Sequence, residues 1–407
     1  MSWEYVKLGD LYSVHNGLSK GGKFFGSGYP FLTFSTVFNN YFIPDELTDL
    51  VQSTEKEQNN YSVKRGDVFV TRTSETSDEL GMSCVALKDY PHATYNGFTK
   101  RMRPLQDGRV LPEYIGYYMR MPSFRGEFQA FSTMTTRASL KNEDLLGLKV
   151  ALPPIETQEK IASTLKAYDD LIKNNQKQIK LLEEAAQRLY KEWFVDLRFP
   201  GHEDVVIVDG VPEGWEKDKA ERFFNITIGK TPPRAEKQWF VNGNDGVPWL
   251  SISDMGTSGV YSFTTSEGLT QEAVKKHNMK VVPAGTIFVS FKLTVGRVSI
   301  ATTDMCTNEA IAHFYIDDDF KQAYTYCYLN NFEYDTLGNT SSISKAVNSK
   351  IIKAMPFVMP DEATILAFDR IVEPILKEIK NKQIVCIKLK EARDRLLPKL
   401  MNGEIEV

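Results

Sequence analysis

Apolar residues recur in alternating steps of three and four along two stretches of this chain, residues 161–193 and 368–400. This spacing places the apolar side chains on one face of a helix, and each stretch spans about four to five heptads, which is long enough for a coiled coil. The pattern therefore predicts two long helices, each with one apolar seam. The seam positions are Ile161, Leu165, Tyr168, Ile172, Ile179, Leu182, Leu189 and Trp193 in the first helix, and Phe368, Val372, Ile375, Ile379, Cys386, Leu389, Leu396 and Leu400 in the second.

The two helical stretches are copies of one sequence unit. Residues 153–194 align without a gap onto residues 360–401, and matched features also precede each copy. These features are Trp3 with Trp215, Gly17 with Gly229, Pro30–Leu32 with Pro248–Leu250, Arg65–Val70 with Ala284–Val289, Gly81 with Gly296, and Asn96 with Asn308. A repeat of this kind predicts one structural unit that occurs twice.

Each half combines strand and helix patterns ahead of its long helix. A Gly turn leads into a run of β-branched and aromatic residues at 65–70 and again at 284–289, which predicts a strand in each half. Short helical patterns follow at 112–121 and 320–330. We therefore predict an α/β (α+β) domain of about 145 residues that occurs twice, with the two long helices paired as an antiparallel coiled coil.

The boundaries divide the chain into six segments. These are a first globular domain (1–152), a first long helix (153–199), a linker (200–211), a second globular domain (212–359), a second long helix (360–402) and a C-terminal tail (403–407). Thr157 and Asp361 are the predicted N-caps of the two helices. Pro398 lacks a backbone N–H, which would allow the second helix to end early.

Two seam positions are polar, Asn175 and Lys382, and they are equivalent in the repeat. If the helices pack antiparallel, a buried polar pair at this point would penalise slipped registers at a cost in stability. The alternative is that both side chains reach solvent. The sequence leaves the two interpretations open.

Composition and motifs exclude several classes of function. The four cysteines have no paired spacing, which indicates a reducing cytoplasm and argues against a cysteine zinc site. The net charge of -4 does not indicate nucleic-acid binding, so a DNA partner would require the basic residues to be concentrated on one face. The N-terminus has no signal pattern, and no apolar run is long enough for a membrane helix. Phe24–Gly28 matches a glycine pattern of methyltransferases, but no catalytic motif accompanies it, and a glycine turn before the Pro30 strand explains it better. The sequence shows no catalytic constellation and no metal spacing.

A set of short motifs, in an order that occurs twice, suggests a family. The motifs are Pro212–Trp215, Gly229–Pro232 and Pro248–Leu250 at the start of the second half, Leu152–Ile155 with Gln158 and Ile161 at the helix entry, and Trp193–Asp196, Leu396–Leu400 and Gly403–Ile405 at the helix ends. In this order they resemble the specificity (S) subunit of type I restriction–modification systems over essentially the whole chain. The first half departs from the pattern at Asn16–Ser19, where a Thr-Pro is missing.

The resemblance implies a non-catalytic subunit with two target-recognition domains, each reading one half of a split, asymmetric site on double-stranded DNA. It also implies two methyltransferase (M) subunits, which bind S-adenosylmethionine and methylate adenine. Where an ATP-dependent translocase–nuclease is present, two such (R) subunits complete the complex. The chain itself is expected to bind no cofactor and no membrane. No base-contact residue can be transferred from the family, because its recognition domains vary with their targets.

Basic residues in the turns of both halves are the candidate DNA contacts, since Lys and Arg can neutralise phosphates or read base edges. For a single residue, solvated surface is the more economical interpretation; for the set, DNA contact is. Arg72 and Lys292 are the best single candidates, because each follows the matching strand. The full set is Lys64, Arg65, Arg72, Lys100, Arg101, Arg103, Arg125, Arg137, Lys230, Arg234, Lys292, Arg297 and Lys345.

Two functions from different classes compete. The first is the DNA-specificity subunit, in which the helices separate the half-site domains and leave an unread spacer. The second is a coiled-coil scaffold that binds only proteins, which the acidic net charge favours. A straight helix from Ile161 to Trp193 would be about 50 Å long, which corresponds to at most about 14 base pairs between half-site centres.

Overall fold

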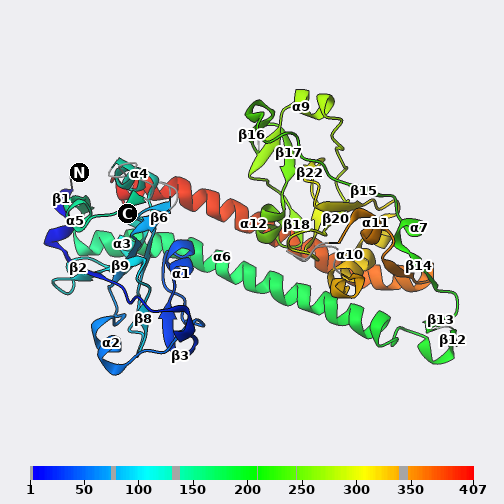
Figure 1. Ribbon diagram of the computed structural model, residues 1–407, viewed down its shortest axis with the longest axis horizontal. Helices are drawn as coiled ribbons and strands as arrows, with labels where there is room; N and C mark the ends of the chain where they lie inside the picture. Colours follow the sequence, from blue (N-terminus) through cyan, green and yellow to red (C-terminus); the bar gives the residue numbers. More distant parts are fainter. Residues whose placement is uncertain (1–2, 75–78, 131–137, 209, 244, 339–346) are drawn as a thin grey trace. The chain divides into compact units, whose positions relative to one another are not determined.

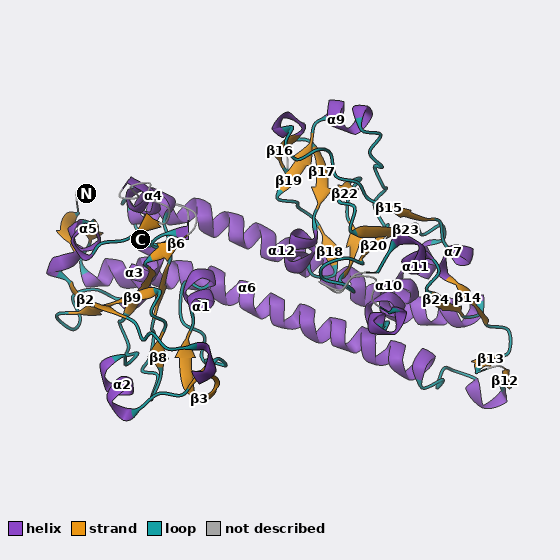
Figure 2. Cartoon of the chain, in the orientation of Figure 1, coloured by secondary structure: helices purple, strands orange, loops and turns teal. Residues whose placement is uncertain are grey.

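The computed structural model describes residues 3–74, 79–130, 138–208, 210–243, 245–338 and 347–407 (Figures 1 and 2). The chain divides into two compact units. Unit 1 comprises residues 1–172 with 387–407, and unit 2 comprises residues 173–386. The division falls near the middle of both long helices, so each unit contains one globular stretch and part of each helix.

Unit 1 is built on two small sheets. The first has the order β2 (Tyr12–Asn16), β9 (Thr99–Pro104), β5 (Val68–Thr71) and β7 (Ser83–Val85), and all its neighbours are antiparallel. The second has the order β4 (Leu50–Val51), β3 (Phe25–Leu32) and β8 (Thr94–Tyr95), with β3 and β8 parallel. A pair formed by β1 (Glu4–Lys7) and β11 (Lys149–Leu152) leads into the first long helix.

Unit 2 repeats this arrangement with two additional strands. Its larger sheet has the order β15 (Ile226–Ile228), β23 (Ile311–Phe314), β20 (Ile287–Ser290), β21 (Val298–Ala301) and β18 (Tyr261–Ser262). Its smaller sheet has the order β16 (Phe240–Asn242), β19 (Glu267–Leu269), β17 (Val247–Leu250) and β22 (Cys306–Thr307), and β17 and β22 are parallel. The pair β14 (Glu216–Lys219) and β24 (Pro356–Met359) leads into the second long helix.

Short helices and two minor strand pairs complete the units. Unit 1 has α1 (Phe34–Asn39), α2 (Glu55–Asn60), α3 (Pro112–Tyr118), α4 (Pro122–Ala130) and α5 (Asn142–Gly147), with the pair β6 (Thr73–Ser74) and β10 (Ala138–Ser139). Unit 2 has α7 (Ala220–Phe223), α8 (Ile252–Ser258), α9 (Gln271–Lys276), α10 (Gln322–Asn331) and α11 (Ser349–Lys353), with the pair β12 (Ile207–Val208) and β13 (Val211–Pro212). The predicted helices near 112–121 and 320–330 are thus confirmed as α3 and α10.

The matched residues of the sequence repeat occupy equivalent places in the two units. Asn96 N–H donates to Leu32 O at 3.0 Å, and Asn308 N–H donates to Leu250 O at the same distance. A Cβ on Gly17 would lie 2.0 Å from Asn96 O, and one on Gly229 would lie 2.1 Å from Asn308 O. Only glycine fits this close approach of two backbone segments, so the predicted repeat is confirmed as a repeat of structure.

The predicted Gly turns before the central strands are also confirmed. Gly66 and Gly285 have φ values of +86° and +87°, in the left-handed region that glycine adopts without strain. The strands that follow, β5 and β20, are buried along their whole length. Phe24–Gly28 differs from its prediction: Gly26 and Gly28 form an irregularity within β3, not a turn before it.

The long helices are α6 (Ile155–Tyr190), which continues as a π-helical turn (Lys191–Val195), and α12 (Glu362–Met401). Every predicted seam position is buried or half-buried. Asp361 caps α12 as predicted, since its Oδ1 accepts from Thr364 N–H at 2.9 Å. Thr157 is not an N-cap, because α6 begins two residues earlier and Thr157 N–H already donates to Pro154 O.

Pro398 does not end α12 early: the helix continues to Met401. Proline costs one hydrogen bond there, but its fixed φ is compatible with helix. Leu397, Leu400 and Met401 beside it are buried in the core of unit 1. This burial holds the last turn in helical conformation.

Within each unit the two helices run antiparallel, as the colours along the chain show (Figure 1). In unit 1, Ile161 and Leu165 share a core with Leu397 and Leu400, and Asp169 pairs with Arg393. In unit 2, the rings of Trp193 and Phe368 lie 5.8 Å apart. A continuous coiled coil over the full length of both helices stays a prediction. No helix of the described residues is long and apolar enough to span a membrane.

Candidate nucleic-acid interface

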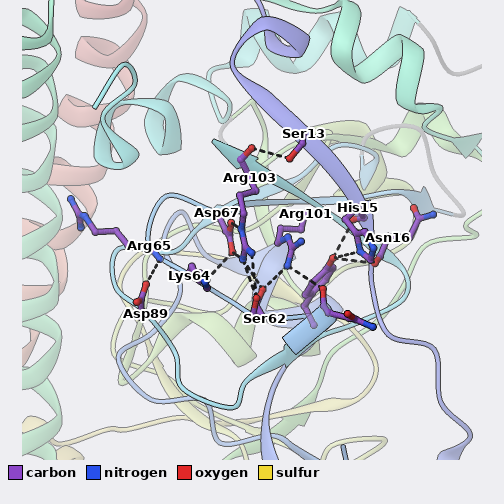
Figure 3. A network of polar contacts seen from close by, with 12 residues as sticks. Ser13, His15, Asn16, Ser62, Lys64, Arg65, Asp67, Asp89, Arg101 and Arg103 are labelled. Carbon is purple, nitrogen blue, oxygen red and sulfur yellow. Dashed lines mark hydrogen bonds and ion pairs between the residues drawn. The ribbon is translucent and has the colours of Figure 1, made fainter. Parts of the chain in front are cut away.

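The densest basic cluster of the sequence is Lys100–Arg103 on β9, and its two arginines make hydrogen bonds within unit 1 (Figure 3). Arg103 forms a bidentate pair with the buried Asp67, with Nε–Oδ1 at 2.7 Å and Nη2–Oδ2 at 2.6 Å. The hydrogen bonds to Asp67 raise the pKa of the Arg103 guanidinium. Asp67 is fully buried and needs a cationic partner. Arg103 therefore stays paired with Asp67 and is poorly placed to contact DNA.

Arg101 has a comparable structural role beside it. Its side chain is buried, Nη1 donates to Ser62 O at 2.8 Å, and the guanidinium lies over the Tyr95 ring at 5.4 Å. Burial lowers the pKa of Arg101. These contacts tie β9 to the segment around Ser62 (Figure 3).

Lys64 and Arg65 lie at the exposed turn before β5 (Figure 3). Arg65 is engaged with Glu113 at 3.1 Å, although its side chain remains 49% exposed. For the Lys64 ammonium, the described part of the chain supplies no hydrogen bond or ion pair. Lys64 therefore remains available to an anion, whereas Arg65 is already shared with Glu113 and Leu87 O and is less available.

Arg72 and Lys100 bring two cationic side chains close together in unit 1, with the carboxylate of Asp144 acting on Lys100 as well. Lys100 is buried, and its Nζ donates to the neutral amide oxygen of Asn142. Burial first, and the charge of Arg72 second, lower the pKa of Lys100. Among the residues that the structure describes, the half-buried Arg72 guanidinium has no hydrogen bond or ion pair. An anion would neutralise this pair of cations.

Of the remaining candidates of unit 1, Arg125 is bound within the fold and Arg137 is not described. Arg125 donates to Leu80 O and lies 6.0 Å from the Phe128 ring. Arg137 lies outside the described residues, as does Lys345 of unit 2.

In unit 2, Arg234 and Lys230 lie exposed beside the smaller sheet. Arg234 pairs with Glu267 at 2.8 Å and also stacks over Phe240 at 4.4 Å and Trp249 at 4.6 Å. Lys230 Nζ donates to His277 O at 2.7 Å. Because these partners are exposed or neutral, both cations keep a solvent-accessible face.

Arg297 and Lys292 belong to the connection between β20 and β21. Arg297 Nη1 donates to Ile252 O at 2.6 Å, which fixes the half-buried guanidinium against α8. Lys292 lies over the Phe291 ring at 5.4 Å. It has no hydrogen bond or ion pair within the described ranges, so it is the least engaged candidate of unit 2.

Sequence reasoning missed a set of cations that pair with aromatic rings near the smaller sheets. Lys20 and Lys23 both lie 5.1 Å from the Phe24 ring, and Lys276 lies 4.4 Å from the Trp239 ring. Cations interleaved with aromatics are typical of nucleic-acid surfaces. The adjacent Lys23 and Phe24 carried this signal in the sequence; the pairing of Lys276 with Trp239 depends on tertiary structure.

Asn175 and Lys382 are both half-buried within unit 2. Lys382 Nζ lies 3.0 Å from Glu378 on its own helix. The proposed role of the two residues in helix register stays a prediction. Among the described residues, no group of three His, Cys, Asp or Glu side chains could hold a metal ion.

Comparisons with known proteins agree with this arrangement. The family model described as the type I restriction modification DNA specificity domain matches residues 1–184 and 212–386. The chain is 27% identical to the type I restriction enzyme MjaIX specificity subunit of Methanocaldococcus jannaschii, with 100% of this chain and 94% of that relative covered. It is 25% identical to the HindI specificity subunit of Haemophilus influenzae, with 99% of each covered. The crystal structure of a type I restriction–modification S subunit from M. genitalium has the same fold, with a TM-score of 0.55, 13% identity, and 98% and 96% coverage.

Proposed function

This chain belongs to the family of type I restriction–modification DNA specificity subunits, and we propose that its two units read the two unlike halves of one bipartite site. DNA sequence recognition is the role of the family. The division of that role between the units, the unread spacer and the docking of partner subunits are the proposal.

One observation carries the proposal: the two units share a backbone frame but differ in side chains at equivalent positions. Lys100 and Arg101 face Val70 and Phe69 across the sheet of unit 1, whereas Ala312 and His313 face Val289 and Phe288 in unit 2. Lys100, Arg101 and His313 are buried, so they mark the divergence of the two copies and are not themselves the base contacts. A repeated frame whose side chains diverge suits two readers of two different base sequences.

Exchange of one recognition domain tests this division. Replacing residues 1–152 with the matching domain of a relative of known target should change one half-site and leave the other intact. Methylation mapping of the host genome measures both half-sites at once. A change in both, from a folded and active variant, would contradict independent reading.

We further propose that α6 and α12 set the length of the unread spacer. Insertion of one heptad near Asn175 and one near Lys382 adds about 10 Å to each helix at 1.5 Å per residue, and should lengthen the spacer by up to about 3 base pairs. The half-site bases should not change. A four-residue insertion at the same points is the matched control, because it breaks the seam. An unchanged spacer in an active heptad variant would contradict the role of the helices.

The chain itself is proposed to be non-catalytic and cytoplasmic. Two copies of one frame offer two equivalent surfaces, which supports docking of two methyltransferase subunits that carry S-adenosylmethionine. Translocase–nuclease subunits would join where the host encodes them. Native mass spectrometry of the co-expressed complex measures the ratio, and one methyltransferase subunit per chain would contradict it.

DNA binding also separates this function from the alternative protein scaffold, which the net charge of -4 favours. Filter binding with random-sequence DNA, with and without methyltransferase subunits, distinguishes the two. A scaffold would retain no DNA in either case.

A further inference from the structure

The connection between β20 and β21 in unit 2 is a hairpin with a tightly fixed base. The buried Ser290 donates its hydroxyl to Thr294 O at 2.5 Å, and its Oγ accepts from Arg297 N–H at 3.0 Å. Gly296 N–H donates to Ser290 O at 2.9 Å. These hydrogen bonds fix both ends of the connection, and residues 292 and 293 lie at its tip.

Leu293 lies at this tip, where both its backbone conformation and the exposure of its side chain are unfavourable. It has φ of +63°, in the left-handed region, which costs a non-glycine residue about 1–2 kcal/mol. Its side chain is 70% exposed, the highest value among the large apolar side chains of the described residues. Gly or Asn would satisfy the same backbone with less strain, so the folding of unit 2 does not explain a leucine here.

The surroundings of Leu293 are suited to DNA. Lys292 precedes it and, within the part of the chain that the structure describes, makes no hydrogen bond or ion pair. A two-stranded β-ribbon can enter the major groove, where the C5-methyl group of thymine is the apolar feature of the base edges. A cation beside an exposed aliphatic side chain therefore matches a phosphate beside a thymine methyl group.

Unit 1 presents the same combination from a different part of its frame. Phe98 is 58% exposed, and Arg72 N–H donates to Phe98 O at 3.0 Å. Its position corresponds to Ala310 in unit 2, because in each unit a backbone N–H donates to the side-chain oxygen of the matched Asn. Phe98 N–H donates to Asn96 Oδ1 at 2.7 Å, and Ala310 N–H donates to Asn308 Oδ1 at 3.1 Å. Each unit thus has one exposed apolar side chain (Phe98 or Leu293) next to one cation (Arg72 or Lys292). Within the described residues, neither cation makes a side-chain hydrogen bond or ion pair.

We propose that Leu293 is a specificity-determining residue that contacts a thymine methyl group in the half-site read by unit 2. This inference rests on the proposed function, because it requires that unit 2 reads DNA. Lys292 supplies the adjacent phosphate contact.

The test uses the complex of the full chain with its methyltransferase subunits and a duplex library randomised over both half-sites. Leu293→Asn should lose a thymine preference at one or two positions of one half-site and bind the wild-type sequence about five- to tenfold more weakly. At such a position, uracil in place of thymine should weaken wild-type binding and leave the variant unaffected. Thermal unfolding of Leu293→Asn should be unchanged or raised, because Asn tolerates the left-handed backbone.

Val281→Thr is the matched control, since Val281 is another exposed apolar residue of unit 2 (42%). It should retain wild-type affinity and preference. If Leu293→Asn selects the wild-type sequence with wild-type affinity, or loses a preference for another base, or if Val281→Thr has the same effect, the inference is wrong while the proposed function stands. If the wild-type complex selects no sequence at all, the proposed function fails and this inference with it.

Discussion

The two units hold their helix pairs together by different chemistry at the same place. In unit 1, Arg393 of α12 pairs with Asp169 of α6 at 2.6 Å, and Tyr117 donates its hydroxyl to the same carboxylate at 2.6 Å. The equivalent positions in unit 2 are Ala186, Leu376 and Cys327, all buried in an apolar core. One frame therefore accepts either a buried ion pair or aliphatic packing.

The same divergence recurs in the larger sheets. The Arg103–Asp67 pair of unit 1 corresponds to Tyr315 and Thr286 in unit 2, as the strand registers show. Buried ion pairs are weak contributors to net stability but costly to break on one side. The comparison shows that the two units share apolar contacts and glycines. Where their polar contacts differ, both partners of the contact differ together.

The largest expected effect comes from breaking the ion pair between the helices. Arg393→Ala leaves the half-buried Asp169 carboxylate with the Tyr117 hydroxyl but without its cation, and should destabilise unit 1 by about 3 kcal/mol, the low end of the range for a broken buried pair. The pKa of Arg393 points the same way: burial opposes the charge, but the hydrogen bond to Asp169 raises the pKa overall. Urea unfolding monitored by tryptophan fluorescence measures the loss.

A variant that, like unit 2, has no charge at these positions provides the control. Arg393→Ala combined with Asp169→Leu and Tyr117→Phe leaves no buried charge, so it should recover most of the lost stability. If this triple variant is as unstable as Arg393→Ala, the ion pair is not the reason for the difference between the units.

The second prediction concerns the least engaged cations. Arg72→Ala should weaken binding of the half-site of unit 1 by about 1–3 kcal/mol, the loss expected at a base edge, and Lys292→Ala should weaken binding through unit 2 by removing a phosphate contact. At a phosphate the loss would be uniform across sequences, with a shallower salt dependence. Titration of the assembled complex against duplexes altered in one half-site assigns each effect.

Arg65→Ala is the matched control, because Arg65 is exposed but already pairs with Glu113. It should change affinity less than Arg72→Ala. Unchanged affinity and salt slope in both Arg72→Ala and Lys292→Ala, with the fold intact, would place these residues away from DNA.

The smallest expected effect is a pH dependence of the free energy of unfolding in unit 2 that arises from His313. Burial lowers the pKa of His313 in unit 2 to about 3, whereas unit 1 has Arg101 at the equivalent position. The unfolded chain takes up a proton near pH 6.5 that folded unit 2 does not, so this stability is present above pH 6.5 and is lost as pH falls toward 3. Between pH 6.5 and 5.5 the loss should be about 1 kcal/mol, because the unfolded histidine is already half protonated at pH 6.5.

His313→Gln should remove this dependence, and His15→Gln, at an exposed histidine of unit 1, should preserve it. Urea unfolding at pH 7.0, 6.5 and 5.5 compares the three proteins. An equal pH slope in wild type and His313→Gln would show that His313 is not the source.

The sequence alone determined the repeat, the two seams and the glycines that the repeat requires. The seams can be recognised from the periodicity of apolar residues along a single helix. The repeat and its glycines can be recognised because the same residues recur at matching positions in the two halves. The seam predicts burial because a 3.5-residue period leaves one face of a helix apolar, and Gly17 and Gly229 are marked because no other residue fits beside Asn96 O and Asn308 O.

Tertiary structure alone decided which cations are free. Arg101 and Arg103 belong to the densest basic run, yet Ser62 and Asp67 bind them, and these partners are 36 or more residues away in the sequence. Charge along the chain does not reveal such pairing, because an ion pair depends on which strands become neighbours. The same reason applies to Pro398, where burial of the last turn of α12 outweighs the missing hydrogen bond, and to Leu293, whose exposure and strain arise only when the hairpin closes.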